Sequence, residues 1–373
     1  MGLLSSGTLI INLDTTLENT VLAGTSPKGI STVMESFAAD AERKNAGVLL
    51  IRNLNGGCSL TASMGSTFRM TTQNSVMGDS LDMFAGLKSH EYSRCLLELM
   101  DRYCTIDSTK RIIYDDYLQM VIELHRKKHV SVKPNELANF SVSDVRALNQ
   151  AVTTDISERD QNELFLKAHN ADLNILQSYF RIFKRNKLGE LTSGTQSFEK
   201  VLDSNGVVEI TLDFANNEKE SVDFLDVLID RLCMRRTSIM VKKQVYVIMD
   251  QVSNEHMIEA GAQRILSLAP WCYMMYSVTD ISNLVKNSTV WVNQCTTMLC
   301  FRQFSAANMQ YCSDLFGTHR VPKVGCSWFG RLGFNVNFVE EPIYKTGDFA
   351  KLPDNTAIFR TSKTGQHCRL QVY

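Results

Sequence analysis

The pattern of apolar and polar positions begins by alternating between strand-like and helix-like spacing. Two short β-rich runs, 8–13 and 20–23, lead into a stretch rich in turn residues, 24–29. From residue 30 to residue 44, apolar residues recur at the spacing of one helix face. The run 47–52 is almost wholly apolar, which is typical of a parallel strand buried on both faces. The order strand, glycine-rich turn, helix and buried strand predicts a βαβ unit.

Helical patterns dominate the middle of the chain. Helical spacing occurs at 91–103, at 114–125, in a segment that opens near 141, and at 158–182. β-branched runs are few here, so residues 85–190 are predicted to form an all-α domain. This domain would be inserted into an α/β domain made of residues 1–84 and 191–373.

Two basic clusters lie within the predicted all-α domain. Arg126, Lys127 and Lys128 end one helical segment, and Arg181 and Lys184 lie near the end of another. Cations complement the dipole at the end of a helix, so a solvated helix end is the ordinary interpretation. The alternative is a surface that contacts the phosphates of a nucleic acid.

The α/β pattern returns after about residue 195. Apolar strand patterns occur at 206–212, 244–250, 271–277 and 297–301, and helical patterns at 221–231 and 306–316. Gly317 closes the last of these helices, and the tail from residue 338 is extended. The sequence therefore predicts an α/β fold with a mainly parallel central sheet and an inserted all-α domain.

Composition and charge narrow the class of protein. The 39 basic and 40 acidic residues give a net charge of −1, which excludes a uniformly basic nucleic-acid-binding protein. None of the 10 cysteines forms a C-x-x-C pair, so a zinc site is not expected. The beginning of the chain has no basic signal region, and no apolar run approaches the roughly 18–20 residues that a transmembrane helix needs. We therefore expect a cytoplasmic protein without a transmembrane segment.

Residues 24–32 have the outline of a phosphate-binding loop. In the pattern G-x-x-x-x-G-K-[ST], backbone N–H groups cradle phosphates, the lysine neutralises them and the hydroxyl holds Mg²⁺. The chain has Ile30 at the lysine position, and Lys28 lies two positions earlier. The candidate nucleotide-binding residues are Gly24, Thr25, Ser26, Pro27, Lys28, Gly29, Ile30, Ser31 and Thr32.

The second half of such a site is an apolar strand that ends in an acidic residue. The strand 244–250 ends in Asp250, which would hold Mg²⁺ together with Ser31. The next position usually carries the glutamate that activates water, but here it is Gln251. An amide cannot accept a proton at neutral pH, so general-base chemistry is not expected from this position.

In their order, these segments resemble the cytoplasmic motor domain of type IV secretion coupling proteins of the TraG/TraD-like group. The resemblance runs from residue 8 to residue 373. Besides the helical insertion, it rests on 18–24, 48–52, 206–212, 244–250, 279–284, 308–317 and 348–353. It implies a RecA-like P-loop ATPase that forms hexamers, binds ATP between subunits, and moves DNA or protein toward a secretion channel. It also implies a sensor glutamine where this chain has Thr279, and an arginine-finger role for Arg320, for which a surface arginine is the alternative.

The replaced positions Ile30, Gln251 and Thr279 leave three hypotheses open. The first is a pseudo-ATPase that acts as a scaffold or adaptor, with binding of ATP and Mg²⁺ weakened or lost. The second is an active ATP-driven translocase that uses Lys28 and a non-standard base. The third is a structural subunit that binds nucleic acid through the two basic clusters. The resemblance implies partners from a secretion or DNA-transfer machine, homo- or hetero-oligomers, and recruitment by partners to the inner face of the membrane.

Overall fold

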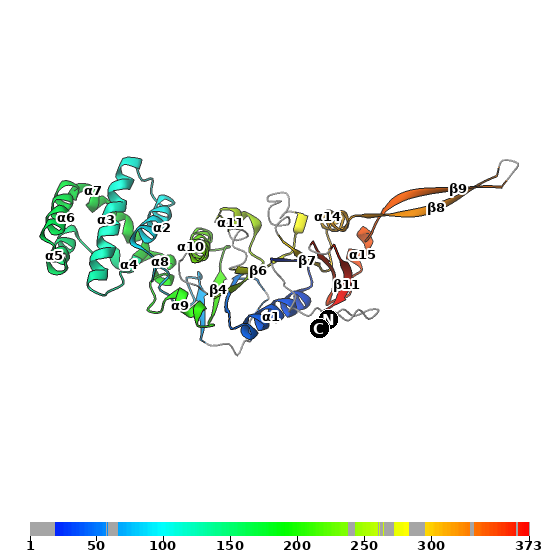
Figure 1. The fold of residues 1–373 in the computed structure, drawn as a ribbon, viewed down its shortest axis with the longest axis horizontal. Helices are drawn as coiled ribbons and strands as arrows, with labels where there is room; N and C mark the ends of the chain where they lie inside the picture. The colour runs from blue at the N-terminus through cyan, green and yellow to red at the C-terminus, as the bar shows by residue number, and fades with distance from the viewer. Residues whose placement is uncertain are drawn as a thin grey trace.

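The molecule is elongated, with an all-α domain at one end, a helix-flanked sheet in the middle and a long β-hairpin at the other end (Figure 1). The computed structural model describes residues 19–56, 58, 66–237, 243–259, 261, 264, 272–282, 295–328, 332–362 and 365–372. The strand expected at 8–13 lies outside the described residues. Of the helices that the structure describes, none is both long enough and apolar enough to span a membrane.

A nine-stranded sheet forms the centre of the molecule, in the order β11-β10-β7-β1-β6-β5-β2-β4-β3. Its strands are β1 (Thr20–Ala23), β2 (Gly47–Asn53), β3 (Thr67–Thr71), β4 (Val207–Leu212), β5 (Val245–Asp250), β6 (Cys272–Val278), β7 (Thr297–Cys300), β10 (Thr356–Thr361) and β11 (His367–Gln371). The strands from β7 to β3 are parallel, whereas β10 and β11 add antiparallel pairs at one edge. The prediction of a mainly parallel sheet is therefore confirmed. β6 lies between β1 and β5, so these two strands are two positions apart in the sheet. Because all three strands are parallel, the ends of β1 and β5 lie at the same edge of the sheet.

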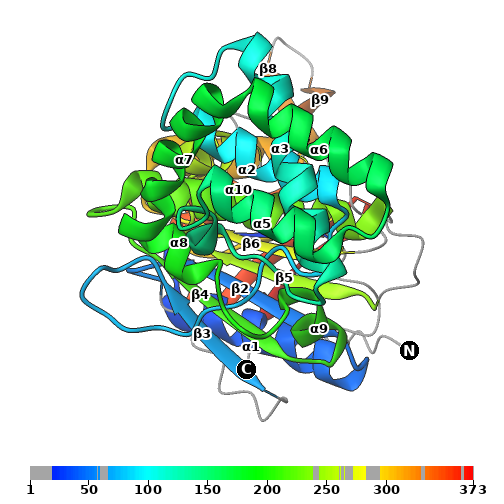
Figure 2. The ribbon, with the colours of Figure 1, turned by 90° about the vertical axis from the view of Figure 1, so that its left-hand side faces the viewer.

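Helices cover both faces of the sheet. α1 (Pro27–Arg43) lies on one face, and α10 (Glu218–Thr237) and α11 (Asn254–Glu259) lie on the other (Figures 1 and 2). Successive residues of a strand face opposite sides, so Val48 and Leu50 pack in the α1 layer while Leu49 and Ile51 pack in the α10 layer. This double burial explains the continuous apolar run in the sequence. The other helices of this part are α9 (Phe198–Asp203), α14 (Ala306–Phe316) and α15 (Thr346–Ala350).

The helices predicted across residues 85–190 are present and form the end of the molecule nearest the viewer in Figure 2. They are α2 (Ser89–Asp101), α3 (Ser108–Lys127), α4 (Pro134–Leu137), α5 (Val142–Val152), α6 (Ile156–Ala168), α7 (Asn170–Arg185) and α8 (Lys187–Leu191). Side chains of Asp107, Ser141 and Asp155 cap α3, α5 and α6 by accepting hydrogen bonds from backbone N–H groups. The apolar core of these helices is continuous with the core beneath α10, which holds the helical end firmly on the sheet.

Three features differ from the sequence prediction. The antiparallel hairpin β8 (Thr318–Trp328) and β9 (Leu332–Pro342) was not expected, and neither was β3, whereas the tail expected to be extended from residue 338 contains the end of β9, β10 and β11 and is interrupted by α15. Proline and glycine within β8 and β9 lower their apparent strand propensity, which hides the hairpin. α1 begins at Pro27 rather than at residue 30, and this boundary changes the geometry of the candidate site.

Candidate functional site

The turn after β1 is shorter than the phosphate-loop pattern requires. Only Gly24, Thr25 and Ser26 lie between β1 and α1, because the helix begins at Pro27. Proline suits this first helical position, since its φ is already helical and the N–H that it lacks would have no helical partner. Positions 27–31 of the motif therefore lie in the first turns of α1 and not in a loop that wraps around phosphates.

Neighbouring strands fasten this turn to the edge of the sheet. The N–H of Gly24 donates to Val278 O at the end of β6 (2.9 Å), and Thr25 donates both its N–H and its hydroxyl to Arg302 O (3.1 Å each). Gly24 has φ +136°, and a Cβ there would lie 2.8 Å from Arg302 O. Glycine is therefore required for the approach of two backbones, independently of any ligand.

Ile30, at the lysine position of the motif, faces the core. Only 5% of Ile30 is exposed, and it packs in the apolar cluster under α1 with Leu22, Met34 and Phe301. The ring of Phe301 also closes the space beside Gly29, where a Cβ would come within 2.6 Å of Phe301 Cε1. A lysine at position 30 would therefore have the base of its side chain among apolar residues.

The polar residues of the motif have ordinary local contacts. Lys28 is exposed, and its carbonyl accepts a hydrogen bond from Thr32 Oγ1 (2.9 Å). The hydroxyl of Ser26 accepts from the N–H of Asn355 (3.5 Å). Ser31 is partly exposed on the first turns of α1.

Asp250 is buried at the end of β5, and both of its carboxylate oxygens have protein donors. Oδ1 accepts from the hydroxyl of Ser277 (2.6 Å), and Oδ2 accepts from the N–H of Cys58 (3.0 Å). Arg52, on the neighbouring strand β2, donates from Nη1 to Cys58 O (2.8 Å). The backbone of residue 58 is thus held directly against the acidic group.

The Cys58 thiol is as deeply buried as this backbone, with 1% of the residue exposed. Burial, together with the negative charges of Asp250 and Glu35, raises the pKa of the Cys58 thiol to about 12. The thiol is therefore protonated at neutral pH, and a protonated thiol is a poor nucleophile.

Gln251 and Thr279 complete this edge of the sheet. Gln251 has φ +55°, and its N–H donates to Ser277 Oγ (3.0 Å). A left-handed backbone costs a residue other than glycine about 1–2 kcal/mol, which the bond to Ser277 helps to offset. Thr279 is exposed immediately after β6. The structure therefore brings Gly24, Thr279 and Gln251 to the carboxyl ends of the adjacent strands β1, β6 and β5.

Arg320 lies elsewhere, on the hairpin strand β8. Its side chain is 75% exposed, and Nε lies 3.7 Å from Oε1 of Glu340 on β9. The structure does not bring it to the edge that carries Asp250. Its pair with Glu340 is an ordinary exposed ion pair across the hairpin, which contributes little to stability.

The two basic clusters differ in how far their charges are balanced. Arg126 pairs with Glu123 (2.9 Å), and Lys127 pairs with Glu158 (2.6 Å), while Lys128 is exposed. Arg181, Lys184 and Arg185 are exposed at the end of α7 and have no ion-pair partner among the residues that the structure describes. We call these three residues the α7 basic end. It is the more strongly cationic of the two clusters.

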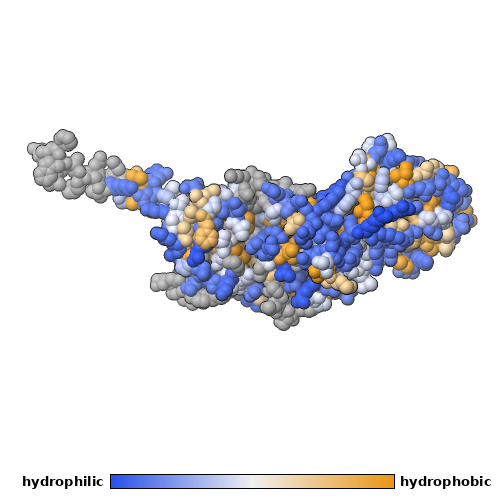
Figure 3. Space-filling model, turned by 180° about the vertical axis from the view of Figure 1, so that it is seen from behind, coloured by the Kyte–Doolittle hydropathy of each residue, from blue (hydrophilic) through white to orange (hydrophobic). Residues whose placement is uncertain are grey.

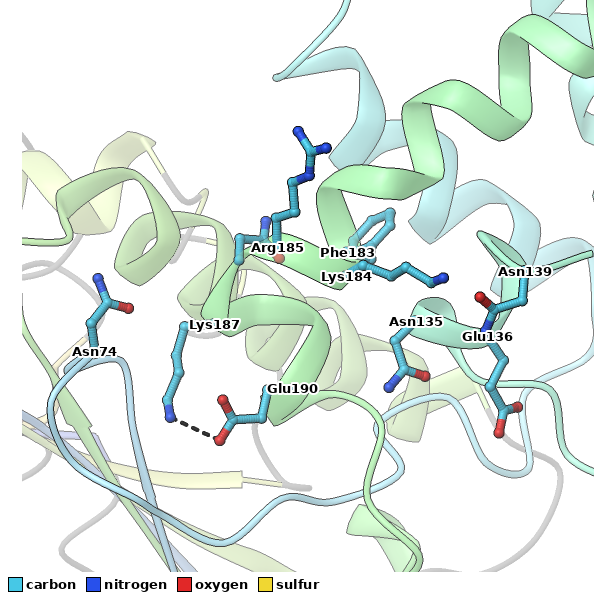
Figure 4. Close-up of a pocket in the computed structure, with 10 residues that line it drawn as sticks. Asn74, Asn135, Glu136, Asn139, Phe183, Lys184, Arg185, Lys187 and Glu190 are labelled. Atoms are coloured by element: carbon cyan, nitrogen blue, oxygen red, sulfur yellow. Dashed lines mark hydrogen bonds and ion pairs between the residues drawn. The ribbon is translucent and has the colours of Figure 1, made fainter.

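A polar cavity of about 490 Å³ lies beside the α7 basic end (Figure 4). Its lining includes the side chains of Asn74, Asn135, Asn139 and Asn186. Lys184 extends toward Asn139, while Lys187 is bound to Glu190, three residues later on α8 (2.8 Å). The sequence analysis missed this cavity because its residues come from α4, α7, α8 and the segment after β3, which no local motif connects.

Comparison with known proteins supports the fold. No family model matches the sequence, and no curated protein is recognisably similar to it. Among solved structures, the unbound bacterial conjugative coupling protein TrwBdeltaN70 matches with a TM-score of 0.60 and 12% identity, over 96% of this chain and 86% of that chain. The plasmid coupling protein TrwB in complex with ADP and Mg²⁺ matches with a TM-score of 0.57 and 12% identity, over 95% and 85%. TrwB with a non-hydrolysable ATP analogue gives 0.59 and 11%, over 96% and 86%.

These matches concern the fold, since the identity is low. They cover nearly the whole chain and confirm the RecA-like α/β architecture that the resemblance implies.

Proposed function

We propose that this chain is a non-hydrolysing relative of the coupling ATPases that acts as a scaffold or adaptor subunit of a secretion or DNA-transfer machine. The observation that carries the proposal is the burial of Ile30 in the apolar layer under α1. A phosphate-loop lysine about 4 Å from a phosphate charge is worth about 4 kcal/mol at an effective dielectric constant of about 20. Ile30 supplies none of this attraction.

The residues at the expected Mg²⁺ position do not fit a metal site well. TrwB was solved with ADP and Mg²⁺. In this chain Ser31 and Asp250 hold the matching motif positions, but each oxygen of Asp250 already accepts a hydrogen bond from the protein. Gln251 lacks the basicity that a water-activating residue needs. These contacts support weakened or lost binding of ATP and Mg²⁺.

A scaffold role remains open to such a chain, because the fold depends on buried strands and not on a nucleotide. The packed layers around the sheet contain apolar side chains from every parallel strand, so they do not require a ligand to be stable. By resemblance, the partners would be secretion or DNA-transfer proteins, and the oligomer a hexamer of one or more kinds of subunit. A cytoplasmic location at the inner face of the membrane follows from the same resemblance.

Steady-state ATP hydrolysis by the purified full chain tests this proposal. We expect turnover at the level of heat-denatured protein, and no change in the variant Lys28→Ala, because Lys28 is exposed and its side chain supports no buried contact. Turnover that follows the protein through size-exclusion chromatography and falls in Lys28→Ala would overturn the proposal. That result would favour the active translocase that uses Lys28 and a non-standard base.

A second candidate function, nucleic-acid binding, is favoured by the α7 basic end. Its three cations are exposed and have no ion-pair partner within the described part of the chain, in contrast to Arg126 and Lys127. The adjoining cavity offers asparagine amides, which can bond to bases, sugars and phosphates alike. Lys128 and the α7 basic end would then supply phosphate contacts. This activity is compatible with a scaffold in a DNA-transfer machine.

A further inference from the structure

The cavity beside the α7 basic end has walls that are polar and charges that are already balanced. The Lys187 side chain is only 7% exposed, and its Nζ donates to Glu190 Oε1 (2.8 Å) and to Val76 O (3.3 Å). The carboxylate of Glu136 accepts from the N–H of Lys133 (3.0 Å) at the start of α4. A further charge inside the cavity would compete with these bonds, so the interior suits a neutral polar group of a ligand.

The exposed side of the same cavity carries cations that are not balanced. Lys184 and Arg185 line the cavity, are exposed, and have no ion-pair partner among the residues that the structure describes. Arg181 lies one turn earlier on α7. Residues three and four positions apart share a helix face, so the three cations form one row. A ligand that fits both parts therefore has a neutral polar group beside several anionic groups.

Asparagine amides in the cavity wall have hydrogen-bonding capacity that the protein does not use. Oδ1 of Asn135 is buried and accepts no hydrogen bond from any described residue. The side chain of Asn139 is likewise not hydrogen-bonded to another described residue, and Lys184 extends toward it (Figure 4). A primary amide offers two donors and an acceptor close together. Because a buried polar atom without a partner is costly, these amides are suited to a ligand with an acceptor beside a donor.

We propose that the cavity holds one unpaired adenine nucleotide of a single strand, with the edge of its base on Asn135 and Asn139 and the neighbouring phosphates on the α7 basic end. The inference rests on nucleic-acid binding, the second candidate function. The base and sugar are the neutral polar part of such a ligand, and the phosphates are its anionic groups. An asparagine amide forms two hydrogen bonds with N6 and N7 of adenine, which discriminates against other bases by about 5- to 150-fold.

The size and the walls of the cavity agree with this ligand. Its volume of about 490 Å³ lies in the range of about 300–1,000 Å³ that is usual for pockets enclosing a small organic group. Phe183 also lines the cavity, but only 2% of it is exposed, so hydrogen bonds rather than stacking select the base. A single base contact of this strength corresponds to a Kd above about 1 mM. Retention of the nucleotide therefore requires the additional phosphates of a strand.

An acidic peptide is the competing occupant, and the cavity is less suited to it. Its carboxylates would also pair with the exposed cations, but a carboxylate that entered the cavity would meet Glu136 and Glu190. One acidic side chain would also leave most of the cavity unfilled. An apolar partner is disfavoured as well, because on the face shown in Figure 3 the apolar spots of the all-α end are separated by hydrophilic residues.

Fluorescence anisotropy with two labelled DNA strands tests the proposal on the full chain. One strand contains only thymidine, and the other is the same strand with one adenine at its centre. The double variant Asn135→Ala/Asn139→Ala removes the amides from the cavity. The matched control is Asn170→Ala/Asn174→Ala, which removes two exposed asparagines, also four positions apart, that do not line the cavity.

We expect the natural chain and the control to bind the adenine strand at least about 5-fold more tightly, which corresponds to about 1 kcal/mol. The double variant should bind both strands equally. Its affinity for the thymidine strand should keep the natural dependence on salt, because neutral side chains release no counterions. The single variant Asn139→Ala, at an exposed position that does not threaten folding, should lose part of the preference.

Salt-dependent binding of both strands with equal affinity by the natural chain would overturn the adenine site and leave nucleic-acid binding in place. A preference for adenine that survives in Asn135→Ala/Asn139→Ala would overturn it too. So would binding of a labelled glutamate-rich peptide that this variant weakens while DNA binding is unchanged, since the cavity would then be a peptide site. If neither strand binds at any salt concentration, the second candidate function fails together with this inference.

Discussion

Arg52 and Asp250 lie opposite each other on the parallel strands β2 and β5, and together they hold the backbone of Cys58. Arg52 donates to the carbonyl of Cys58, and Asp250 accepts from its N–H. The acidic residue that a motor ATPase would use for Mg²⁺ thus connects two segments 192 positions apart in the sequence. We interpret Asp250 as a structural residue of this chain.

The variant Asp250→Ala should destabilise the protein. It leaves the N–H of Cys58 and the hydroxyl of Ser277 without their acceptor in a buried environment, which costs about 2–4 kcal/mol in the free energy of unfolding. Urea denaturation measures this loss. Asp354→Ala is the control, because Asp354 is 77% exposed in its pair with Arg302 and should matter by about 0.5 kcal/mol or less. An Asp250→Ala variant as stable as the control would contradict the structural role.

Restoring the motif lysine by Ile30→Lys should also destabilise the protein rather than create a nucleotide site. A lysine held in an apolar core shifts its pKa by about 3 units, equivalent to about 4 kcal/mol. The control Ile30→Val keeps the position apolar and should cost about 0.5–1.5 kcal/mol. Urea denaturation gives both values. A stable Ile30→Lys protein that gains binding of Mg²⁺ and ATP would show that position 30 can face a ligand.

This prediction differs from what the sequence pattern alone would give, and the reason is the first residue of α1. According to the motif alone, replacing Ile30 by lysine would restore the phosphate-binding loop. The pair Ser26 and Pro27 carries the missing signal, an N-cap residue followed by proline at the first helical position. With the helix begun there, position 30 turns toward the sheet.

Other parts of the fold were accessible from the sequence because their causes are local. The prediction placed a helix at 306–316 closed by Gly317, and α14 has these bounds with Gly317 at φ +80°. The buried strands β2 and β5 were also visible as apolar runs. The contact of Cys58 with Asp250 and the cavity beside α7 depend on long-range packing, which no local pattern reveals. The hairpin register likewise becomes clear only when both strands are aligned.

The pH dependence of stability should contain a contribution from Asp226. This residue of α10 lies between Arg102 (2.6 Å) and Arg264 (3.1 Å), yet burial raises its pKa to about 6, with Asp230 adding to the shift and the two arginines opposing it. The folded state then binds a proton more tightly than the unfolded state, whose aspartate has a pKa of about 3.9. The stabilising contribution is therefore full below pH 4 and is lost as the pH rises to about 6.

The variant Asp226→Asn isolates this contribution. The free energy of unfolding of the natural chain minus that of Asp226→Asn should fall by up to about 3 kcal/mol between pH 4 and pH 7, because other titrating groups cancel in the difference. Urea denaturation of both proteins at several pH values measures it. A difference that is constant over this range would contradict the raised pKa.

Neutralising the α7 basic end should lower the affinity for single-stranded DNA. It should also make this affinity less dependent on the salt concentration. Each phosphate contact contributes about 0.7 to the slope of log K against log salt concentration, so Arg181→Ala/Lys184→Ala/Arg185→Ala should reduce the slope by about 2. Fluorescence anisotropy with a labelled oligonucleotide measures both quantities. The control Arg126→Ala/Lys127→Ala removes two cations that already have carboxylate partners, and should leave the slope nearly unchanged. Equal losses in the two variants would mean that binding is not centred on α7.

The most direct measurement of the central claim is an equilibrium titration of the full chain with ATP and Mg²⁺, followed by calorimetry and by the melting temperature of the same samples. A ligand present at 100 times its Kd would stabilise the folded state by about 2.7 kcal/mol, which is a shift of several degrees. The account predicts no saturable heat and an unchanged melting temperature up to millimolar ATP. A saturable isotherm with a rise in melting temperature, both lost in Lys28→Ala, would contradict it.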